Sequence, residues 1–196
     1  MMTRRRIVIA MGASVLAAPL ASFAQRLPAK VARIGILATL SASIFANRVE
    51  ALRAGLREFG YLEGRNIVLE PRSAEKFDRM PELAAELVRL NVDVIVAGGT
   101  PAIRAAKQAT GTIPIVIAAV GDAVAGGLVA SLAQPGGNVT GSTYFAPELA
   151  AKQLELLKET LSAAGRVAVV LNPDNRAMAP TLRAVEAAAG AMKVEL

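Results

Sequence analysis

Short runs in which nearly every residue is apolar or β-branched alternate along this sequence with stretches of helical periodicity. The clearest runs span residues 32–38, 92–97, 113–119 and 166–171, and shorter ones span 67–70 and 139–141. A strand that is apolar at nearly every position is buried on both faces, which is typical of a parallel sheet covered by helices. The pattern therefore predicts an α/β fold with a doubly wound parallel sheet.

Apolar residues recur at spacings of three and four between these runs, as they do on the buried face of a helix. We expect helices over residues 49–59, 82–90, 125–132, 148–161 and 178–192, together with one that begins at Pro101. Gly60 is expected to end the first helix in a left-handed conformation. Helices of this kind connect parallel strands.

The first 24 residues have the three-part order of a secretory signal peptide. Arginines at 4–6 precede an apolar run over 7–18, and the small residues Ser22 and Ala24 flank a predicted cleavage site before Gln25. The apolar run is shorter than the ~20 residues that a membrane-spanning helix needs, which disfavours an uncleaved anchor. Paired arginines also occur in twin-arginine signals, but the general secretory route is favoured here. We expect a periplasmic protein.

Composition excludes several classes of function. The chain contains neither Cys nor His, so Ser-His-Asp and Cys-His systems and the usual zinc sites cannot form. Without the three arginines of the export signal, the formal net charge falls from +6 to +3. This is a poor footprint for nucleic acid, which needs Lys and Arg clustered on one face. Neither a G-x-G-x-x-G nor a P-loop motif is present, and we predict no cofactor.

Ligands of open parallel sheets bind at the carboxyl ends of the strands, where loops and helix N-termini present backbone N–H groups. Four loops in such positions cover residues 39–43, 98–100, 121–122 and 172–175. The candidate ligand-binding residues within them are Thr39, Ser41, Gly98, Gly99, Thr100, Asp122, Asn172 and Asn175. We predict no catalytic residue and no metal ligand.

Two of these loops carry the clearest chemistry. Gly98 and Gly99 would let a ligand approach the backbone, and the N-terminus of the following helix favours a carboxylate or another anion. Alternatively, the glycines only form a tight turn and Thr100 only caps the helix. Asp122 would pair with a ligand ammonium if it faces a cleft, and otherwise would act only as a helix cap.

The other candidates also have local explanations. Asn172 and Asn175 flank Pro173 in a turn, where Asn is common for reasons of backbone conformation alone. Tyr144 and Phe145 either stack on a ligand or pack at the junction of two lobes. The sequence leaves these alternatives open.

Three runs together resemble a known family. They are F-D-R-M-P-E-L-A-A-E-L-V-R-L-N-V-D-V-I-V-A-G-G-T-P-A at 77–102, I-P-I-V-I-A-A-V-G-D-A-V at 113–124 and G-L-V-A-S-L-A-Q-P-G-G-N-V-T-G at 127–141. This order of segments is similar to that of the ABC transporter substrate-binding proteins of the tryptophan/tyrosine type. The resemblance extends from about Arg33 to the last residue. One departure is Ala123, where members of the family often carry Pro after the Asp.

The resemblance implies a type I periplasmic-binding-protein fold, in which two α/β lobes hold a small molecule between them. It implies that residues 98–101, 121–122 and 172–175 face the cleft. It also implies a non-enzymatic role in import, with a small-molecule solute, such as an amino acid or a related acid, and the ABC permease subunits of the inner membrane as partners.

The predicted domains are the signal peptide at 1–24, an N-terminal α/β lobe at 25–145 and the start of a second α/β lobe at 146–196. The second part supplies a helix, a strand, a helix and the first residues of another strand, which is too little to bury a sheet on both faces. We therefore expect a truncated second lobe with apolar faces only partly covered, and weak or absent binding of a solute.

Two other classes of function compete with this interpretation. A lac-repressor-type ligand-sensing protein has the same two-lobed fold, but it would begin with a basic helix-turn-helix instead of an export signal. A secreted α/β enzyme of unknown reaction would need a carboxylate pair or a cofactor that the sequence does not reveal.

Overall fold

The computed structural model describes residues 30–172 and 175–196, and residues 31–196 form one compact unit. The predicted export signal and its cleavage site lie outside the described residues. Within the described part of the chain, no helix is both long and apolar enough to cross a membrane.

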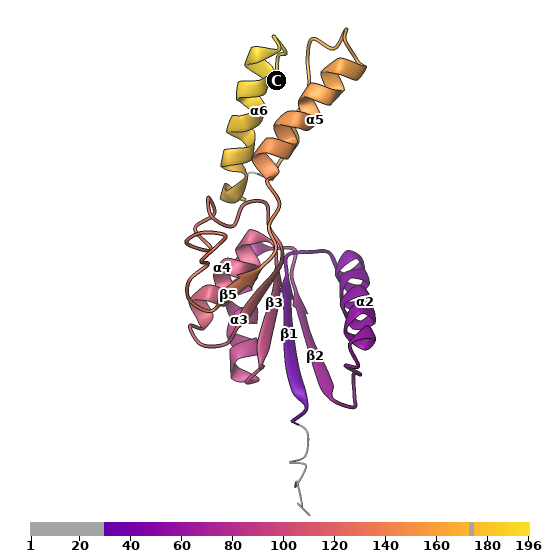
Figure 1. The fold of residues 1–196 in the computed structure, drawn as a ribbon, viewed down its shortest axis with the longest axis vertical. Helices are drawn as coiled ribbons and strands as arrows, with labels where there is room; N and C mark the ends of the chain where they lie inside the picture. The colour runs from indigo at the N-terminus through magenta and orange to yellow at the C-terminus, as the bar shows by residue number, and fades with distance from the viewer. Residues whose placement is uncertain (1–29, 173–174) are drawn as a thin grey trace, which may run out of the picture. The chain divides into compact units, whose positions relative to one another are not determined.

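A five-stranded parallel sheet forms the centre of the fold, with strand order β2-β1-β3-β4-β5 (Figure 1). The strands are β1 (Ala32–Ala38), β2 (Ile67–Ser73), β3 (Val94–Gly98), β4 (Ile115–Ala119) and β5 (Val139–Gly141). In the register of the sheet, Ile34 lies beside both Leu69 and Val94, and Ile95 lies beside Ile115. The prediction of a parallel α/β sheet is confirmed.

Strand β2 is longer than the sequence predicts, because it continues through Pro71 to Ser73. A proline cannot donate a backbone hydrogen bond, which argues for the end of a strand when only sequence is considered. Here β2 pairs with β1 alone and forms an edge of the sheet. An edge strand has one unpaired side, and Pro is tolerated there.

Helices cover both faces of the sheet (Figure 1). On one face, α2 (Ala42–Glu58) packs Phe45 and Val49 against Ile34 and Ile36 of β1. On the other face, α3 (Met80–Arg89) and α4 (Thr100–Ala109) enclose a larger core with β3 and β4. Successive residues of a strand therefore enter different cores, as a sheet buried on both faces requires.

Gly35 is a point of close approach between β1 and α3. A Cβ atom at this position would lie 3.1 Å from both Cδ atoms of Leu87 and 3.3 Å from Cγ2 of Val92. Leu87 is fully buried. The absence of a side chain at residue 35 thus allows α3 to pack directly on the strand.

The end of α2 agrees with the sequence prediction, whereas the starts of α3 and α4 differ from it. Gly60 follows α2 with φ of +80°, which confirms its predicted left-handed conformation. The predicted helix at 82–90 begins two residues earlier, at Met80, after a short 3-10 turn η1 (Phe77–Arg79). Thr100 is the first residue of α4, and its N-cap is Gly99. The alternative in which Thr100 caps this helix is therefore wrong.

The predicted helix at 125–132 does not form; this segment consists of turns and bends. The amides of Gly126 and Leu128 still donate to the carbonyls of Asp122 and Ala123, as in one isolated helical turn. Gly127 then adopts φ of +66°, which ends the turn. Adjacent glycines disfavour a helix, and here the turn instead places Leu128 in the core of the α3–α4 face.

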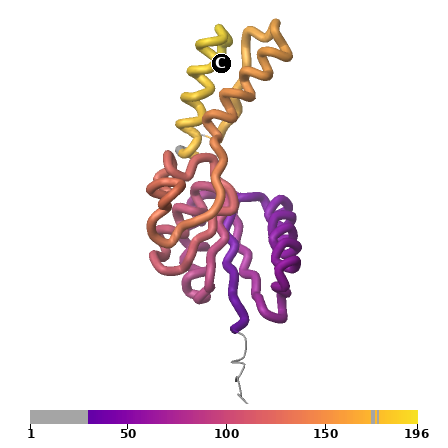
Figure 2. Tube along the Cα trace, viewed as in Figure 1, coloured from indigo at the N-terminus to yellow at the C-terminus, as the bar shows by residue number. Residues whose placement is uncertain are grey.

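Residues 146–196 contain α5 (Ala146–Thr160), the 3-10 turn η2 (Arg176–Met178) and α6 (Ala179–Ala191). Figure 2 traces the chain from β5 through residues 142–145 into α5. Leu154 of α5 forms a small buried cluster with Val185, Ala189 and Val194. The chain thus adds a helix pair after the sheet.

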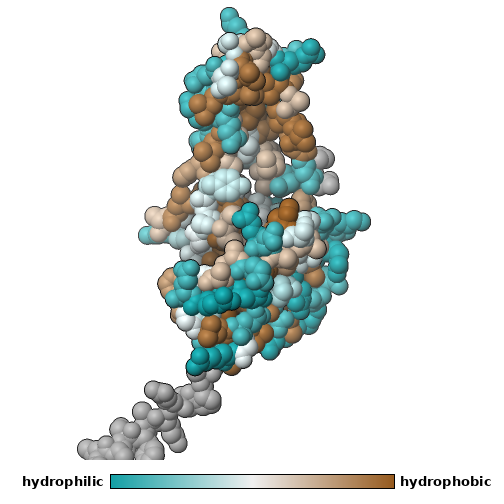
Figure 3. All heavy atoms as spheres, turned by 90° about the vertical axis from the view of Figure 1, so that its right-hand side faces the viewer, coloured by the Kyte–Doolittle hydropathy of each residue, from teal (hydrophilic) through white to brown (hydrophobic). Residues whose placement is uncertain are grey.

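The strands predicted at 166–171 and 194–196 are wrong as extended elements. Within the described residues they form a single parallel bridge between Arg166 and Glu195. Val170 is 96% exposed, because the described residues after the bridge pair with no strand in the part of the chain that the structure describes. Leu157 and Leu161, which helical spacing places on the buried face of α5, are also exposed. Figure 3 shows apolar surface over this part of the chain.

Candidate functional site

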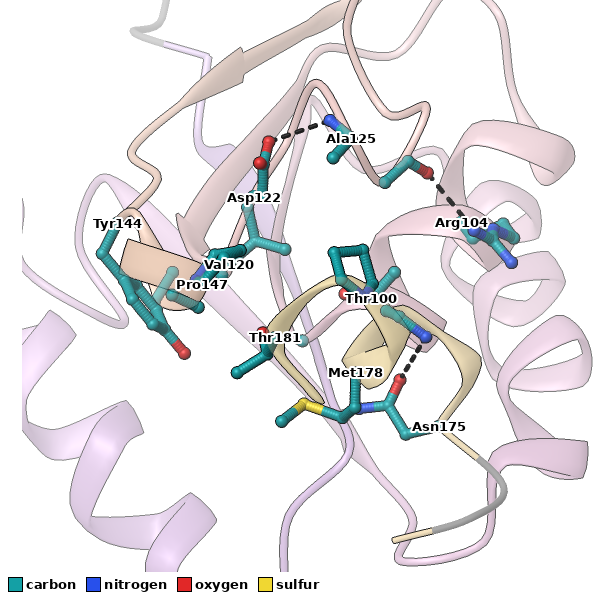
Figure 4. Close-up of a pocket in the computed structure, with 17 residues that line it drawn as sticks. Thr100, Arg104, Val120, Asp122, Ala125, Tyr144, Pro147, Asn175, Met178 and Thr181 are labelled. Atoms are coloured by element: carbon teal, nitrogen blue, oxygen red, sulfur yellow. Dashed lines mark hydrogen bonds between the residues drawn. The ribbon is translucent and has the colours of Figure 1, made fainter. Parts of the chain in front are cut away.

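The carboxyl ends of β3 and β4 lie side by side, since Gly98 pairs with Ala119 across a register shift. Beyond them lies a cavity of about 250 Å³ (Figure 4). Its lining comes from the start of α4, the turn after β4, the start of α5 and the segment that leads into α6: Gly99, Thr100, Arg104, Ala119, Val120, Gly121, Asp122, Ala125, Gly126, Tyr144, Ala146, Pro147, Asn175, Ala177, Met178, Pro180 and Thr181.

Gly99 forms the sharp turn between β3 and α4. Its φ is +86°, a value that residues with side chains rarely adopt. A Cβ atom here would also lie only 2.8 Å from Oγ1 of Thr39. Because the N-cap is a glycine, no side chain caps the first turn of α4. The N–H groups of this turn therefore remain suited to an anion.

Asp122 is held in place by its own turn. Its Oδ1 accepts hydrogen bonds from the amides of Val124 and Ala125 at 3.0 and 2.8 Å. Its Oδ2 has no partner among the described residues. The carboxylate thus has a fixed orientation and one oxygen that can accept a further hydrogen bond.

Arg104 reaches the same cavity from α4. Its guanidinium donates to the carbonyl of Gly126 at 3.3 Å, which ties α4 to the turn after Asp122. Arg104 and Asp122 are the charged members of the described lining. One cation and one anion beside a helix N-terminus favour a solute that carries both signs of charge.

The opposite side of the cavity comes from residues near the starts of α5 and α6. Tyr144, Thr181 and Asp122 lie around the same space (Figure 4). Tyr144 is about half exposed, so its ring presents an apolar surface and its hydroxyl a polar group. Oδ1 of Asn175 accepts from the amide of Ala177 at 3.3 Å, which helps to fix the turn that enters α6.

The structure brings together four of the predicted site residues, namely Gly99, Thr100, Asp122 and Asn175. Thr39 and Gly98 instead line a mostly apolar cavity of about 360 Å³ beside α2, which Gly99 also borders. Ser41 occupies the N-cap position of α2. Asn172 borders a different depression, formed with residues 75–78.

Sequence reasoning missed Arg104 and Thr181. A signal for Arg104 exists, because it stands four residues after Thr100 and so shares its face of α4. Thr181, like Met178 and Pro180, reaches the cavity only through the way the entry to α6 packs, which no local spacing reveals.

An open parallel sheet with an uncapped helix N-terminus and a solute-sized cavity at its strand ends is characteristic of ligand-binding α/β lobes. Sequence comparison makes the assignment specific. The chain belongs to the ABC transporter substrate binding protein family, and the match covers residues 33–196.

Three individual proteins illustrate the similarity. A tyrosine-binding protein of Clostridioides difficile (strain R20291) is 40% identical over 121 residues, which are 60% of this chain and 34% of that protein. A solved conserved domain protein of Vibrio cholerae superposes with a TM-score of 0.78 at 32% identity, covering 85% of this chain and 56% of the other.

The third is the ABC domain from Streptococcus pneumoniae in complex with L-Trp, with a TM-score of 0.75 at 25% identity. The match covers 84% of this chain and 55% of that one. The chain therefore spans about a third of the curated relative and just over half of each of these solved structures.

Proposed function

We propose that this chain contributes the first lobe of an extracytoplasmic substrate-binding protein that delivers a small solute to an ABC importer. The observation that carries the proposal is the joint presence of Arg104, Asp122 and the uncapped N-terminus of α4 around one cavity. Membership of the substrate-binding family supports it and favours it over the enzyme and repressor-type alternatives.

The expected solute is an amino acid or a related acid. Its carboxylate would lie at Thr100 and the first turn of α4, near the guanidinium of Arg104. Its ammonium would donate to the unpartnered Oδ2 of Asp122. Tyr144 would contact the solute's side chain. Support comes from the two relatives described with tyrosine and L-Trp in their names.

Delivery to an ABC permease and location in the periplasm are part of the same proposal. They rest on the family and on the charged, apolar and small-residue order of the first 24 residues. Mass spectrometry of the protein from the periplasmic fraction would test the location, with a mature chain that begins at Gln25 as the expected product. A full-length chain confined to the cytoplasm would contradict it.

Affinity in two-lobed receptors depends on contacts that are completed when the lobes close. The chain spans just over half of each of the two solved relatives, so we expect this chain alone to make only part of these contacts and to bind a solute weakly. A method that detects millimolar affinity is therefore required, and backbone amide NMR satisfies this because binding shifts the signals of individual residues.

The test is a titration of the mature chain with L-tryptophan while the amides of Thr100 and residues 121–125 are monitored. Tryptamine, which lacks the carboxylate, and indole-3-propionate, which lacks the ammonium, are the matched controls. We expect L-tryptophan to shift both sets of signals and each control to bind more weakly. No shift with L-tryptophan or with any other amino acid would refute the proposed solute class.

A further inference from the structure

The segment between β5 and α5 is hydrogen-bonded along the end of β4 and the turn that follows it. The amide of Ser142 donates to the carbonyl of Ile117 at 3.0 Å, and that of Tyr144 donates to Val120 at 3.0 Å. Residues 142–146, which we name the crossover segment, therefore run beside the loop that carries Asp122. The proposed solute site is attached to this segment.

Thr143 makes two of the contacts that hold this loop. Its hydroxyl donates to the carbonyl of Val120 at 3.1 Å and accepts from the amide of Ala123 at 3.2 Å. The two backbone groups stand on either side of Gly121 and Asp122. A single half-buried side chain thus bridges the beginning and the end of the short loop that presents the Asp122 carboxylate.

Further along the crossover segment, Ala146 packs closely against Gly121. The amide of Ala146 donates to the carbonyl of Gly121 at 3.0 Å. A Cβ atom at Gly121 would lie 2.9 Å from the Cβ atom of Ala146. The Asp122 loop therefore packs directly on the first turn of α5.

We infer that Thr143 is a positioning residue of the solute site. Its hydroxyl fixes the Asp122 loop to the crossover segment, so that the loop and the segment move together when the solute binds. This inference rests on the proposed function for its link to the solute. Thr143 itself does not line the cavity; it acts through Asp122.

The first measurement is hydrogen exchange by NMR, and it requires no ligand. Thr143→Val retains the branched shape but removes the hydroxyl. We expect the amides of Ala123, Val124 and Ala125 to exchange roughly fivefold to tenfold faster, because the loop opens locally more often. The amides of Ile95 and Ile103 in the core should be unchanged.

Two variants provide the comparison. Ser142→Ala removes the neighbouring hydroxyl, which donates to the carbonyl of Ala118 at 2.8 Å, and should leave exchange at residues 123–125 unchanged. Thr143→Ser retains the hydroxyl and should restore slow exchange. Equal acceleration in Ser142→Ala would show a general loosening of the crossover segment and would overturn the inference, as would unchanged exchange in Thr143→Val.

A titration of the same variants with L-tryptophan completes the test. We expect Thr143→Val to bind roughly threefold to tenfold more weakly than the wild type, and Thr143→Ser and Ser142→Ala to bind as the wild type does. Wild-type affinity in Thr143→Val overturns the positioning role while leaving the proposed function intact.

Absence of binding in the wild type counts against the proposed function instead, and the exchange comparison then decides the role of Thr143. Should Thr143→Val not fold, the wild type provides the answer directly. A hydroxyl proton of Thr143 that exchanges slowly enough to be seen by NMR supports the bond donated to Val120, and a slowly exchanging Ala123 amide supports the bond that the hydroxyl accepts. Free exchange of both protons overturns the inference.

Discussion

Gly99 combines two demands that no other residue type meets. It needs a positive φ to turn from β3 into α4, and it needs an empty position where Oγ1 of Thr39 comes within 2.8 Å of a would-be Cβ atom. The first demand concerns the backbone alone, whereas the second depends on the end of β1. Together they place the N-terminus of α4 at the cavity.

Gly99→Ala should therefore destabilise the protein by about 1–3 kcal/mol, the cost of holding a side chain in an unfavourable backbone region. Urea unfolding followed by circular dichroism measures the change. Gly111→Ala is the matched control, because Gly111 has open space around it and no positive φ. A Gly99→Ala variant as stable as Gly111→Ala would show that the turn can relax.

Thr100 and Asp122 test the two ends of the proposed solute. Thr100→Val and Asp122→Asn should each weaken binding of L-tryptophan by about 1–3 kcal/mol, since each removes a partner from a charged group of the ligand. NMR titration of the single variants gives the affinities. Unchanged affinity in both variants would show that the solute does not bind at this cavity.

At the scale of elements, the sequence pattern predicted the strands of the sheet but not every helix. The parallel strands were predictable because a strand covered on both faces needs an apolar residue at nearly every position. Ile34, Ile95 and Ile115 are such residues, and all three are buried. The expected helix at 125–132 had the right periodicity but failed at Gly126 and Gly127, where two adjacent glycines favour a turn. Local propensity outweighed the apolar spacing there.

The candidate site was predictable only in part, because some of its residues are placed by tertiary packing and not by a strand next to them in the sequence. Thr100 and Asp122 lie within three residues of the ends of β3 and β4, so the position of each strand largely fixes the position of the residue. Thr181 and Tyr144 belong to segments whose placement depends on tertiary packing, which no spacing along the chain records. Asn172 appeared equivalent to Asn175 in the sequence, yet only Asn175 lines the cavity.

Packing of α3 on β1 provides a test at the level of elements. Leu87→Ala should cost about 2–5 kcal/mol, because it leaves a cavity beside Gly35 at a fully buried position. Leu161→Ala, at a leucine that is 56% exposed, should change stability by no more than about 0.5 kcal/mol. Thermal unfolding of the two variants compares them, and similar losses would contradict the described packing.

At the scale of the whole molecule, the sheet and the helix pair differ in how well they are covered. The sheet has helices on both faces, whereas α5 and α6 enclose a cluster of four buried residues. Leu156, Leu161 and Val170 remain exposed. Stability is therefore expected to be uneven along the chain, and highest in the sheet.

Limited proteolysis should reveal this difference. We expect a resistant core that begins near residue 31 and ends between residues 145 and 152, with early cleavage in residues 161–172. Mass spectrometry of the fragments identifies the ends. A chain that resists cleavage through Leu196 and unfolds in one cooperative transition would show that the helix pair is as stable as the sheet.

The edges of the sheet affect whether folded molecules can pair with one another. Pro71 interrupts the row of backbone donors on β2, and Glu70 and Arg72 place charges beside it. At the opposite edge, β5 has three residues. Neither edge offers a long uncharged row of donors and acceptors to a strand of another molecule. The folded sheet is therefore a poor template for fibre growth.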